Sequence, residues 1–464
     1  DYTQWTIKVR SGITFSDGTP VDAAAIIRNL NDTGSSLLVA KALVDVARNT
    51  DGTFKTTTLD PMSFTIFMGK NGDPSKPLSW PGFDFYLTGQ WGLIASPAWL
   101  DKVKKDPTVA SKPVGSGPFI VQSYAPRDAL VVTKNPHYWQ KDKDGVQLPY
   151  LDKVTFKVIE DSVTTEQALQ DGNIDIFSTS NAQVIADFRK TPDKFPMIED
   201  DNYVSTGHLL VDLAKSASPI SDARVRCAIS KAIDRNEIAD LVYAGIPKPA
   251  NGVFSPGQEG HLDDNGFNPD LDIEGAKTLI AAYLKDHPGP INVRLGHTAD
   301  RVTSQLSDLI KGYLAKIGVS VAVDTVPQDQ FITLALMGDK SFYMYTWLQH
   351  SGLKADGQNF WWNSGSGTKD GALSLNFARI NDPQVDKDLA ATRSDPDPAK
   401  RQAAAEDLNR TFAKNCYQIP LLWGPTGIPH KASVKNLQTA TTPDGTTILA
   451  IDGEHFLTNV WLKK

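Results

Sequence analysis

The chain has 464 residues, more than one hydrophobic core supports, because single cores stop growing at about 250–300 residues. We therefore expect two lobes, or two lobes with a subdomain. The net charge of −7, from 47 Lys and Arg against 54 Asp and Glu, argues against a nucleic-acid partner, which needs a basic face.

The first part of the chain predicts short strands and one helix. Trp5, Ile7 and Val9 alternate with polar residues, as in a half-buried strand. Thr19 is expected to cap a helix that runs to about Leu30, with a proline in its first turn. Residues 63–68 are predicted as a further strand.

Residues 113–170 read as a hairpin, a strand and a short helix. The runs 119–124 and 130–134 are rich in β-forming residues and are separated by Ala-Pro-Arg-Asp, which predicts the hairpin. Residues 154–159 alternate as a strand, and residues 165–170 are expected to form the helix.

From about residue 219 the pattern changes to alternating strands and helices. Ser221 is expected to cap a helix with one apolar face. Residues 291–295 and 319–323 are predicted strands on either side of a helix over 302–317. A strand, a helix and a strand over that span predict a parallel pair with a right-handed crossover.

Seven blocks of the sequence, taken in chain order, are similar to those of a known protein family. They are Trp5–Pro20, Pro113–Phe119, Asn135–Trp139, Leu169–Ile176, Ser221–Asp234, Asn381–Asp386 and Ile419–Leu422. Together they resemble family 5 of the bacterial extracellular solute-binding proteins, the peptide- and nickel-type receptors of ATP-binding-cassette importers. Family members carry a segment before the Trp5 block, so we expect that segment to be missing here and one sheet edge of the first lobe to be open.

The resemblance implies an α/β fold of the large type II periplasmic-binding-protein kind, a two-lobe clamp with an extra subdomain, joined by two crossing strands. We expect residues 1–110 to form the subdomain of lobe 1, residues 111–208 and 424–464 the rest of lobe 1, and residues 209–423 lobe 2. The segments 203–213 and 417–423 are extended and apolar and flank the α/β region. They are the expected crossing strands, with His208, Leu210 and Leu421 at the hinge.

The stretch from Tyr343 to Trp362 is the candidate ligand-binding wall. It places tryptophans and polar residues in a glycine-containing loop after a strand, where flat rings can cover a ligand and polar tips can orient it. The candidate contacts are Trp347, His350, Asp356, Asn359, Trp361, Trp362 and Trp423. We expect Trp347 and one of Trp361 or Trp362 to touch ligand, while core packing is an equal alternative for Trp423.

His350 marks a departure from the peptide-binding members of the family. In those proteins an aspartate stands three residues after the equivalent of Trp347 and pairs with the α-ammonium of the peptide. Histidine cannot replace a fixed anion in that role. Asp356 is expected either to take over the role or to be a solvated loop residue.

The remaining motifs concern cysteines and enzyme chemistry. Cys227 and Cys416 allow one disulfide, or they are two small buried residues, and so few cysteines fit an oxidising compartment. The eight histidines contain no His-Glu-x-x-His pattern, and Gly-x-Ser-x-Gly is absent. We therefore expect no enzyme, no metal site and no cofactor.

The expected function is that of a monomeric receptor, anchored by lipid outside the cytoplasmic membrane, that closes on an oligopeptide-like solute and delivers it to the permease of an ATP-binding-cassette importer. Three alternatives stay open. The same fold could bind an oligosaccharide, as the tryptophans and His350 suggest, or a nickel chelate, although no tight His/Cys cluster is visible. The third is a hydrolase with two carboxylates about 5–10 Å apart.

Overall fold

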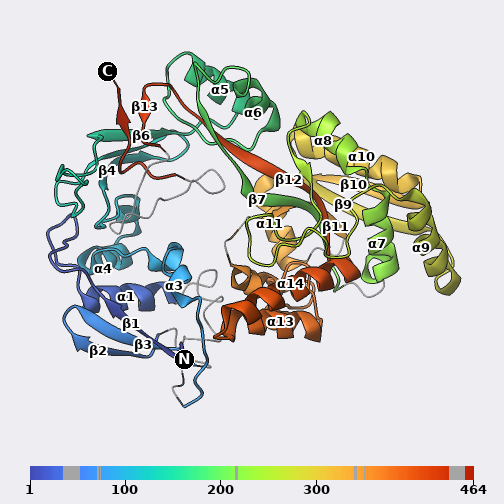
Figure 1. Ribbon diagram of the computed structural model, residues 1–464, viewed down its shortest axis with the longest axis horizontal. Coiled ribbons are helices and arrows are strands. Elements are labelled where there is room, and N and C mark those ends of the chain that lie inside the picture. The colour runs from blue at the N-terminus through green and yellow to red at the C-terminus, as the bar shows by residue number, and fades with distance from the viewer. Residues whose placement is uncertain are drawn as a thin grey trace.

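The computed structural model describes residues 1–34, 53–69, 73, 75–214, 218–338, 342–349, 352, 354–437 and 455–463. The chain forms two lobes that lie side by side, and strands β7 (Met197–Val211) and β12 (Gln418–Pro429) pass from one to the other (Figure 1). We call the lobe with the N-terminus lobe 1 and the other lobe 2. Each has its own buried apolar clusters, as expected for a chain of this length.

Lobe 1 begins with an antiparallel sheet in the order β1-β3-β2. Its strands are β1 (Gln4–Lys8), β2 (Thr56–Asp60) and β3 (Ser63–Phe67). The exposure of β1 alternates residue by residue, which confirms the predicted half-buried strand. Helices α1 (Ala23–Gly34), α3 (Phe83–Tyr86) and α4 (Pro97–Lys105) complete this part of the lobe, and Phe64, Trp80 and Phe83 are fully buried in its core.

Helix α1 begins later than predicted. The side chain of Asp22 accepts a hydrogen bond from the Ala25 N–H at 2.8 Å, so Asp22 caps the helix. The prediction that Thr19 is the cap was wrong, because the hydroxyl of Thr19 instead donates to Asp17 within the preceding turn.

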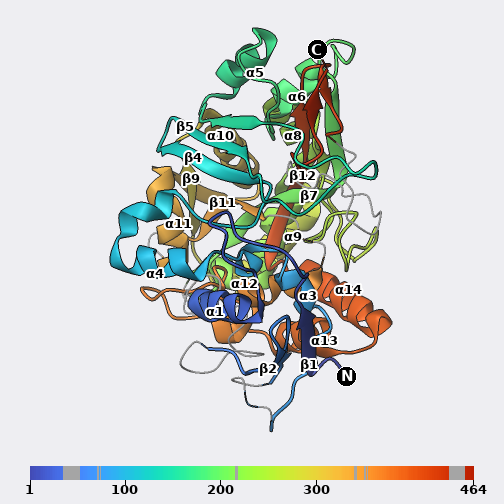
Figure 2. The same cartoon turned by 90° about the vertical axis from the view of Figure 1, so that its left-hand side faces the viewer.

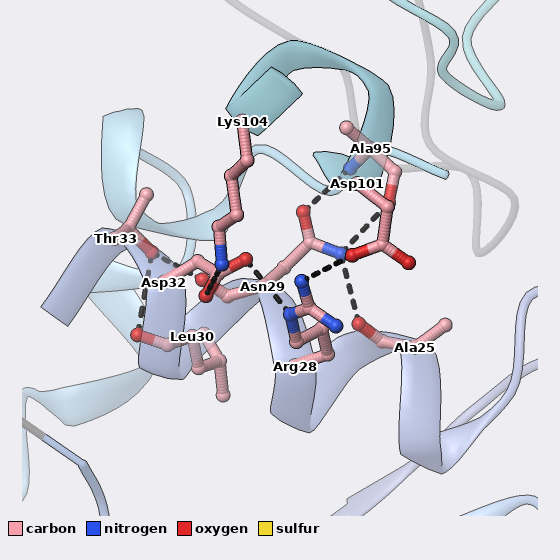
Figure 3. A network of polar contacts seen from close by, with 9 residues as sticks. All are labelled: Ala25, Arg28, Asn29, Leu30, Asp32, Thr33, Ala95, Asp101 and Lys104. Atoms are coloured by element: carbon pink, nitrogen blue, oxygen red, sulfur yellow. Dashed lines mark hydrogen bonds and ion pairs between the residues drawn. The ribbon is translucent and has the colours of Figure 1, made fainter. Parts of the chain in front are cut away.

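A polar network holds α1 against the segment that leads into α4 (Figure 3). The amide of Asn29 donates to the Ala95 carbonyl and accepts from the Ala95 N–H, at 2.8 Å in each case. Asp32 forms ion pairs with Arg28 and with Lys104 of α4. The buried amide of Asn29 therefore fixes the helix to a backbone segment 66 residues away.

The predicted hairpin is confirmed by an antiparallel sheet in the order β4-β5-β6. Its strands are β4 (Phe119–Ala125), β5 (Ala129–Lys134) and β6 (Lys153–Lys157). Helices α5 (Ser162–Gln170) and α6 (Ala182–Phe188) follow. Helix α5 starts three residues before the predicted start, because Asp161 accepts a hydrogen bond from the Thr164 N–H. Near the C-terminus, β13 (Val434–Lys435) pairs with β14 (Trp461–Leu462).

Lobe 2 is built on a six-stranded sheet in the order β10-β9-β11-β7-β12-β8. Strands β9 (Ile291–Thr298) and β10 (Val319–Val326) are parallel and are joined by α10 (Arg301–Ala315), which confirms the predicted crossover unit. Strand β11 (Met344–Gln349) runs parallel to β9 and antiparallel to β7, and β8 (Lys248–Pro249) forms the edge.

Helices cover both faces of this sheet. One face packs with α7 (Ala223–Ala232), α8 (Arg235–Tyr243), α9 (Ile273–Asp286) and α10. The other packs with α11 (Gln328–Met337), α12 (Asn359–Trp362), α13 (Pro383–Ser394) and α14 (Pro398–Asn415). Successive residues of β7 alternate between the two cores, with Leu209 in the first and Leu210 in the second.

Helix α7 begins one residue later than the sequence predicts. Asp222 caps α7 by accepting from the Arg224 N–H at 2.8 Å, so the prediction that Ser221 caps the helix was wrong by one residue.

Cys227 of α7 and Cys416, which follows α14, form a disulfide inside lobe 2. Of the two alternatives for the cysteines, the structure has the bridge.

The crossing strands pair with each other on both sides of the lobe boundary. Their antiparallel register runs from Leu210 opposite Gln418 to Met197 opposite Pro429. The segments 203–213 and 417–423 are therefore neighbours, as predicted, and both strands are longer than expected at the lobe 1 end. Two shifts of register interrupt the pairing, between Pro420 and Leu422 and between Gly424 and Thr426 in β12.

Candidate functional site

A buried polar group lies where β7, β11 and β12 run side by side. The side-chain amide of Gln418 donates to Gln349 at 2.6 Å and lies 3.1 Å from Nε2 of His208. The other ring nitrogen of His208 lies 3.2 Å from the carbonyl of Thr206. Burial lowers the pKa of His208 to about 4, so the imidazole is neutral and accepts from Gln418.

The two other expected hinge residues are apolar and buried. Leu210 lies opposite Gln418 in the strand pairing and is 5% exposed. Leu421 is the residue skipped by the first register shift of β12 and is 2% exposed. All three positions thus lie on the paired crossing strands; their role in bending stays a prediction.

Trp347 lies next to this polar group, since it is opposite His208 in the β11–β7 pairing. Its half-buried ring stacks on Phe331 with centroids 5.4 Å apart and meets Phe377 edge-on at 5.3 Å. Trp361, also half-buried, contacts the same Phe377 at 5.0 Å. Two partly accessible indole rings therefore share one aromatic surface in lobe 2.

Trp362 belongs to the core instead. It is 4% exposed and packs against Phe254 and Phe412, with centroids 5.7 and 4.3 Å apart. Trp362 is therefore a core residue, and of the two neighbouring tryptophans Trp361 stays the predicted ligand contact.

Asp356 lies in the 3-10 helix η5 (Ala355–Gln358) and is neither exposed nor free. One carboxylate oxygen accepts from Nε of Arg393 at 2.6 Å, and the other accepts from the indole N–H of Trp80 at 2.8 Å. The Arg393 and Asp356 side chains are only 9% and 6% exposed. Burial acts to lower the pKa of Arg393, but the charge of Asp356 and the hydroxyl of Tyr86 outweigh it and raise that pKa, so the guanidinium is charged.

These contacts correct the expectation for Asp356. A solvated loop residue would be exposed, whereas Asp356 is buried, so that expectation was wrong. Both carboxylate oxygens already accept from protein donors, and the other expected role, as an anchor for a ligand ammonium, stays a prediction. Asn359 donates to the Leu389 carbonyl at 3.4 Å, and His350 lies outside the described residues.

Trp423 lies on β12 beside a shallow hollow. The hollow is lined by Asp201, Val204, Ile246, Lys248, Pro256, Trp423 and Pro425. The half-buried indole meets His261 edge-on at 5.5 Å, and its N–H has no hydrogen-bond partner among the described residues. Because this nitrogen is buried, the N–H would meet a ligand oxygen only after the residues around the hollow move.

Sequence reasoning missed Trp80, Tyr86 and Arg393. Trp80 and Arg393 bind Asp356 from positions 276 and 37 residues away in the chain, and no local pattern marks them. Among the residues that the structure describes, no three His, Cys, Asp or Glu side chains are grouped as metal ligands would be. Over the same residues, no helix has the length and apolar character needed to cross a membrane.

Comparison with known proteins decides the family. The sequence model of the bacterial extracellular solute-binding proteins, family 5 Middle, matches residues 1–372. The chain belongs to this family. It is therefore a solute-binding receptor of the family 5 type, as the blocks from Trp5 onward predict, and its family is one of extracellular proteins.

Individual relatives of this family 5 chain are distant. The glutathione-binding protein GsiB of Salmonella paratyphi A is 25% identical over 438 residues, which cover 91% of this chain and 78% of that protein. The oligopeptide-binding protein AppA of Bacillus subtilis, in complex with a nonapeptide, has a TM-score of 0.77 at 17% identity, over 100% of this chain and 88% of that one. DppA of Helicobacter pylori with the peptide STSA has a TM-score of 0.79 at 19% identity, over 100% and 87%. These structures confirm the two-lobe type II fold.

Proposed function

We propose that this family 5 receptor captures a peptide or a peptide-like small solute between its lobes and delivers it to the permease of an ATP-binding-cassette importer. The observation that carries the proposal is the pair of separate cores joined by β7 and β12, the arrangement that a hinged clamp needs. GsiB is described as a glutathione-binding protein, and the AppA and DppA structures each contain a peptide. These relatives support a peptide-like solute. Catalysis has no part in this function.

We further propose how the chain is divided and where it is held. Residues 1–110 form the subdomain of lobe 1, residues 111–208 and 424–464 the rest of that lobe, and residues 209–423 lobe 2. The protein acts as a monomer, and a lipid anchor holds it outside the cytoplasmic membrane, close to its permease.

The proposed solute contacts are Trp347, His350, Asn359, Trp361 and Trp423. The aromatic surface of Trp347 and Trp361 offers flat apolar area, and Trp423 lines the hollow beside β12. His208, Leu210 and Leu421 are the proposed hinge, because they lie where the crossing strands pair.

An oligosaccharide is a second candidate solute. Asp356, the carboxylate expected to pair with a peptide ammonium, is engaged by Arg393 and Trp80, and this favours a solute without an ammonium. Sugars carry no ammonium and stack on indole rings.

Calorimetry with glutathione and short peptides, and in parallel with cello- and xylo-oligosaccharides, tests the solute class. We expect peptide-class binding, weakened about tenfold or more by Trp347→Ala, which removes a large ring from the contact surface. The matched control is Trp461→Ala, at an indole that is 40% exposed in β14, and it should leave affinity unchanged. Binding of an oligosaccharide and of no peptide would instead identify the solute as an oligosaccharide.

Small-angle scattering tests the closure. Saturation with the bound solute should reduce the radius of gyration, because the closed state contacts solute from both lobes. Unchanged dimensions with every solute that binds would contradict the hinged mechanism.

A further inference from the structure

The two lobes touch at a second place, away from the crossing strands. Trp80 and Tyr86 belong to the core of lobe 1, whereas Asp356 and Arg393 belong to η5 and α13 of lobe 2. In Figure 1 helix α3, which ends at Tyr86, faces α13 of the opposite lobe below the crossing strands, and Figure 2 also shows these two helices next to each other. The contact therefore lies where lobe movement would open and close it.

Four residues make this contact; Trp80, Asp356 and Arg393 are buried, and Tyr86 is half-buried. The indole N–H of Trp80 donates to Asp356 at 2.8 Å, and the Tyr86 hydroxyl lies 3.3 Å from the Asp356 carbonyl. Arg393 donates to the Tyr86 hydroxyl at 3.2 Å, and its guanidinium carbon lies 5.0 Å from the Trp80 ring centroid. Hydrogen bonds to an ionised acceptor and a cation over an indole are among the stronger polar contacts in proteins.

The acceptor Asp356 and its charge partner lie on lobe 2, whereas the neutral indole donor lies on lobe 1. Asp356 and Arg393 lie on the same lobe and neutralise each other there, so their ion pair needs no partner from across the cleft. Arg393 occupies one carboxylate oxygen and leaves the other for the indole of Trp80. Lobe 2 thus presents a preformed acceptor, and lobe 1 supplies a neutral donor that can leave without stranding a charge.

We propose that Trp80, Tyr86, Asp356 and Arg393 form a latch that holds the lobes closed before any solute arrives. The proposal rests on the hinge closure proposed above and adds to it that part of the closing free energy comes from the protein itself. A solute then has to supply less of that free energy, and the apparent affinity depends on the fraction of molecules that the latch keeps closed.

The latch predicts a defined change when the indole N–H is removed. Trp80→Phe keeps a ring in the core and deletes only the donor to Asp356. Loss of a hydrogen bond to a charged acceptor should lower the ratio of closed to open molecules by about tenfold. Tyr86→Phe, which deletes the hydroxyl between Arg393 and the Asp356 carbonyl, should shift the ratio in the same direction.

Trp91→Phe is the matched control. Trp91 is 2% exposed in the same core and contacts Phe83 as Trp80 does, with centroids 5.5 Å apart in both cases. Its indole N–H has no hydrogen-bond partner within the part of the chain that the structure describes. The control therefore removes the same volume from the same core without touching lobe 2.

Double electron–electron resonance on the solute-free protein measures the ratio directly. Spin labels at Lys102→Cys on α4 and Lys311→Cys on α10 report the distance between lobes, and the two native cysteines are tied in their disulfide. We expect a predominantly short distance in the otherwise unsubstituted protein and in Trp91→Phe. Trp80→Phe and Tyr86→Phe should add a longer distance.

Three outcomes would overturn the latch. They are a long distance in the protein with its native latch, an unchanged short distance in both latch variants, and an equal shift in Trp80→Phe and Trp91→Phe, which would trace the change to core packing. No solute is added, so each of these leaves the proposed capture of solute to be judged separately by calorimetry.

Discussion

His208 is a neutral residue in a place where its charge would be costly. It is 1% exposed, and burial lowers its pKa from 6.5 to about 4. In the unfolded chain the imidazole has its ordinary pKa, so between these two values the unfolded state binds a proton that the folded state does not. Stability must therefore fall as the pH decreases through this window.

His208→Gln tests this consequence. Glutamine offers an acceptor to Gln418 and does not titrate, so the variant should lose about 2 kcal/mol less stability than the native protein between about pH 7 and pH 5. Urea unfolding at the two pH values measures the difference. His137→Gln is the control, because His137 is exposed and should leave the pH dependence as it is.

At this scale the kind of site was more predictable than its members. The tryptophans near residue 350 indicate an aromatic surface, and the structure places Trp347 and Trp361 on one. Sequence alone did not separate Trp361 from its neighbour Trp362, because adjacent helical residues point in different directions and only the packing partners decide which is buried. The engagement of Asp356 depends on Trp80, which is 276 residues away.

At the scale of elements, aspartate is the common start of the helices. Eight α-helices of the described chain have an N-cap aspartate whose side chain accepts a backbone N–H; the caps are Asp22, Asp161, Asp222, Asp234, Asp272, Asp300, Asp382 and Asp397. Such a cap satisfies a free N–H and places a negative charge at the positive end of the helix.

Asp300 at the start of α10 is a suitable test. Burial acts to raise its pKa, but hydrogen bonds from Thr298 and Thr303 outweigh this and lower it. Asp300→Ala should reduce the free energy of unfolding by about 1 kcal/mol, measured by urea titration at neutral pH. Asp308→Ala, at an exposed position of the same helix, should change it by less than about 0.5 kcal/mol. Equal losses in the two variants would contradict a specific role of the cap.

Helices and strands were predictable where apolar residues recur at a regular spacing over many positions. The residues at which they begin were predicted less accurately. Helix α10 and its two parallel strands follow from that period, and the buried Leu306, Ile310 and Leu314 confirm it. Starts were misplaced at α1 and α7, because Thr19 and Ser221 are good caps by residue type. In both cases an aspartate closer to the helix makes the bond, and only the backbone geometry distinguishes the two.

At the scale of the whole molecule, the disulfide closes a long part of lobe 2. Cys227 and Cys416 are 189 residues apart in the chain, so the bond restricts the unfolded chain strongly. Replacing both by serine should lower the free energy of unfolding by about 3–5 kcal/mol in denaturant titrations. Both cysteines lie in lobe 2, so the inter-lobe distance should stay unchanged. A stability equal to that of the native protein would show that the bond contributes little.

The two-lobe plan follows from chain length and from the ordered blocks, whereas the contacts between lobes do not. Length requires more than one core, and the paired segments 203–213 and 417–423 are recognisable as extended and apolar. The meeting of Trp80 with Asp356 depends on the relative orientation of two bodies, which no local pattern encodes.

We expect the two register shifts of β12 to set where the ribbon of β7 and β12 bends between the lobes. In a regular ladder, sliding one strand along the other would break many hydrogen bonds together, whereas a bulge leaves a residue unpaired and lets the strand bend there. The shifts at Leu421 and Pro425 are four residues apart and occur within the ribbon, not at its ends. We therefore expect the lobes to move by bending of the ribbon at these two shifts and not by sliding of its strands, so that the same two surfaces meet at each closure.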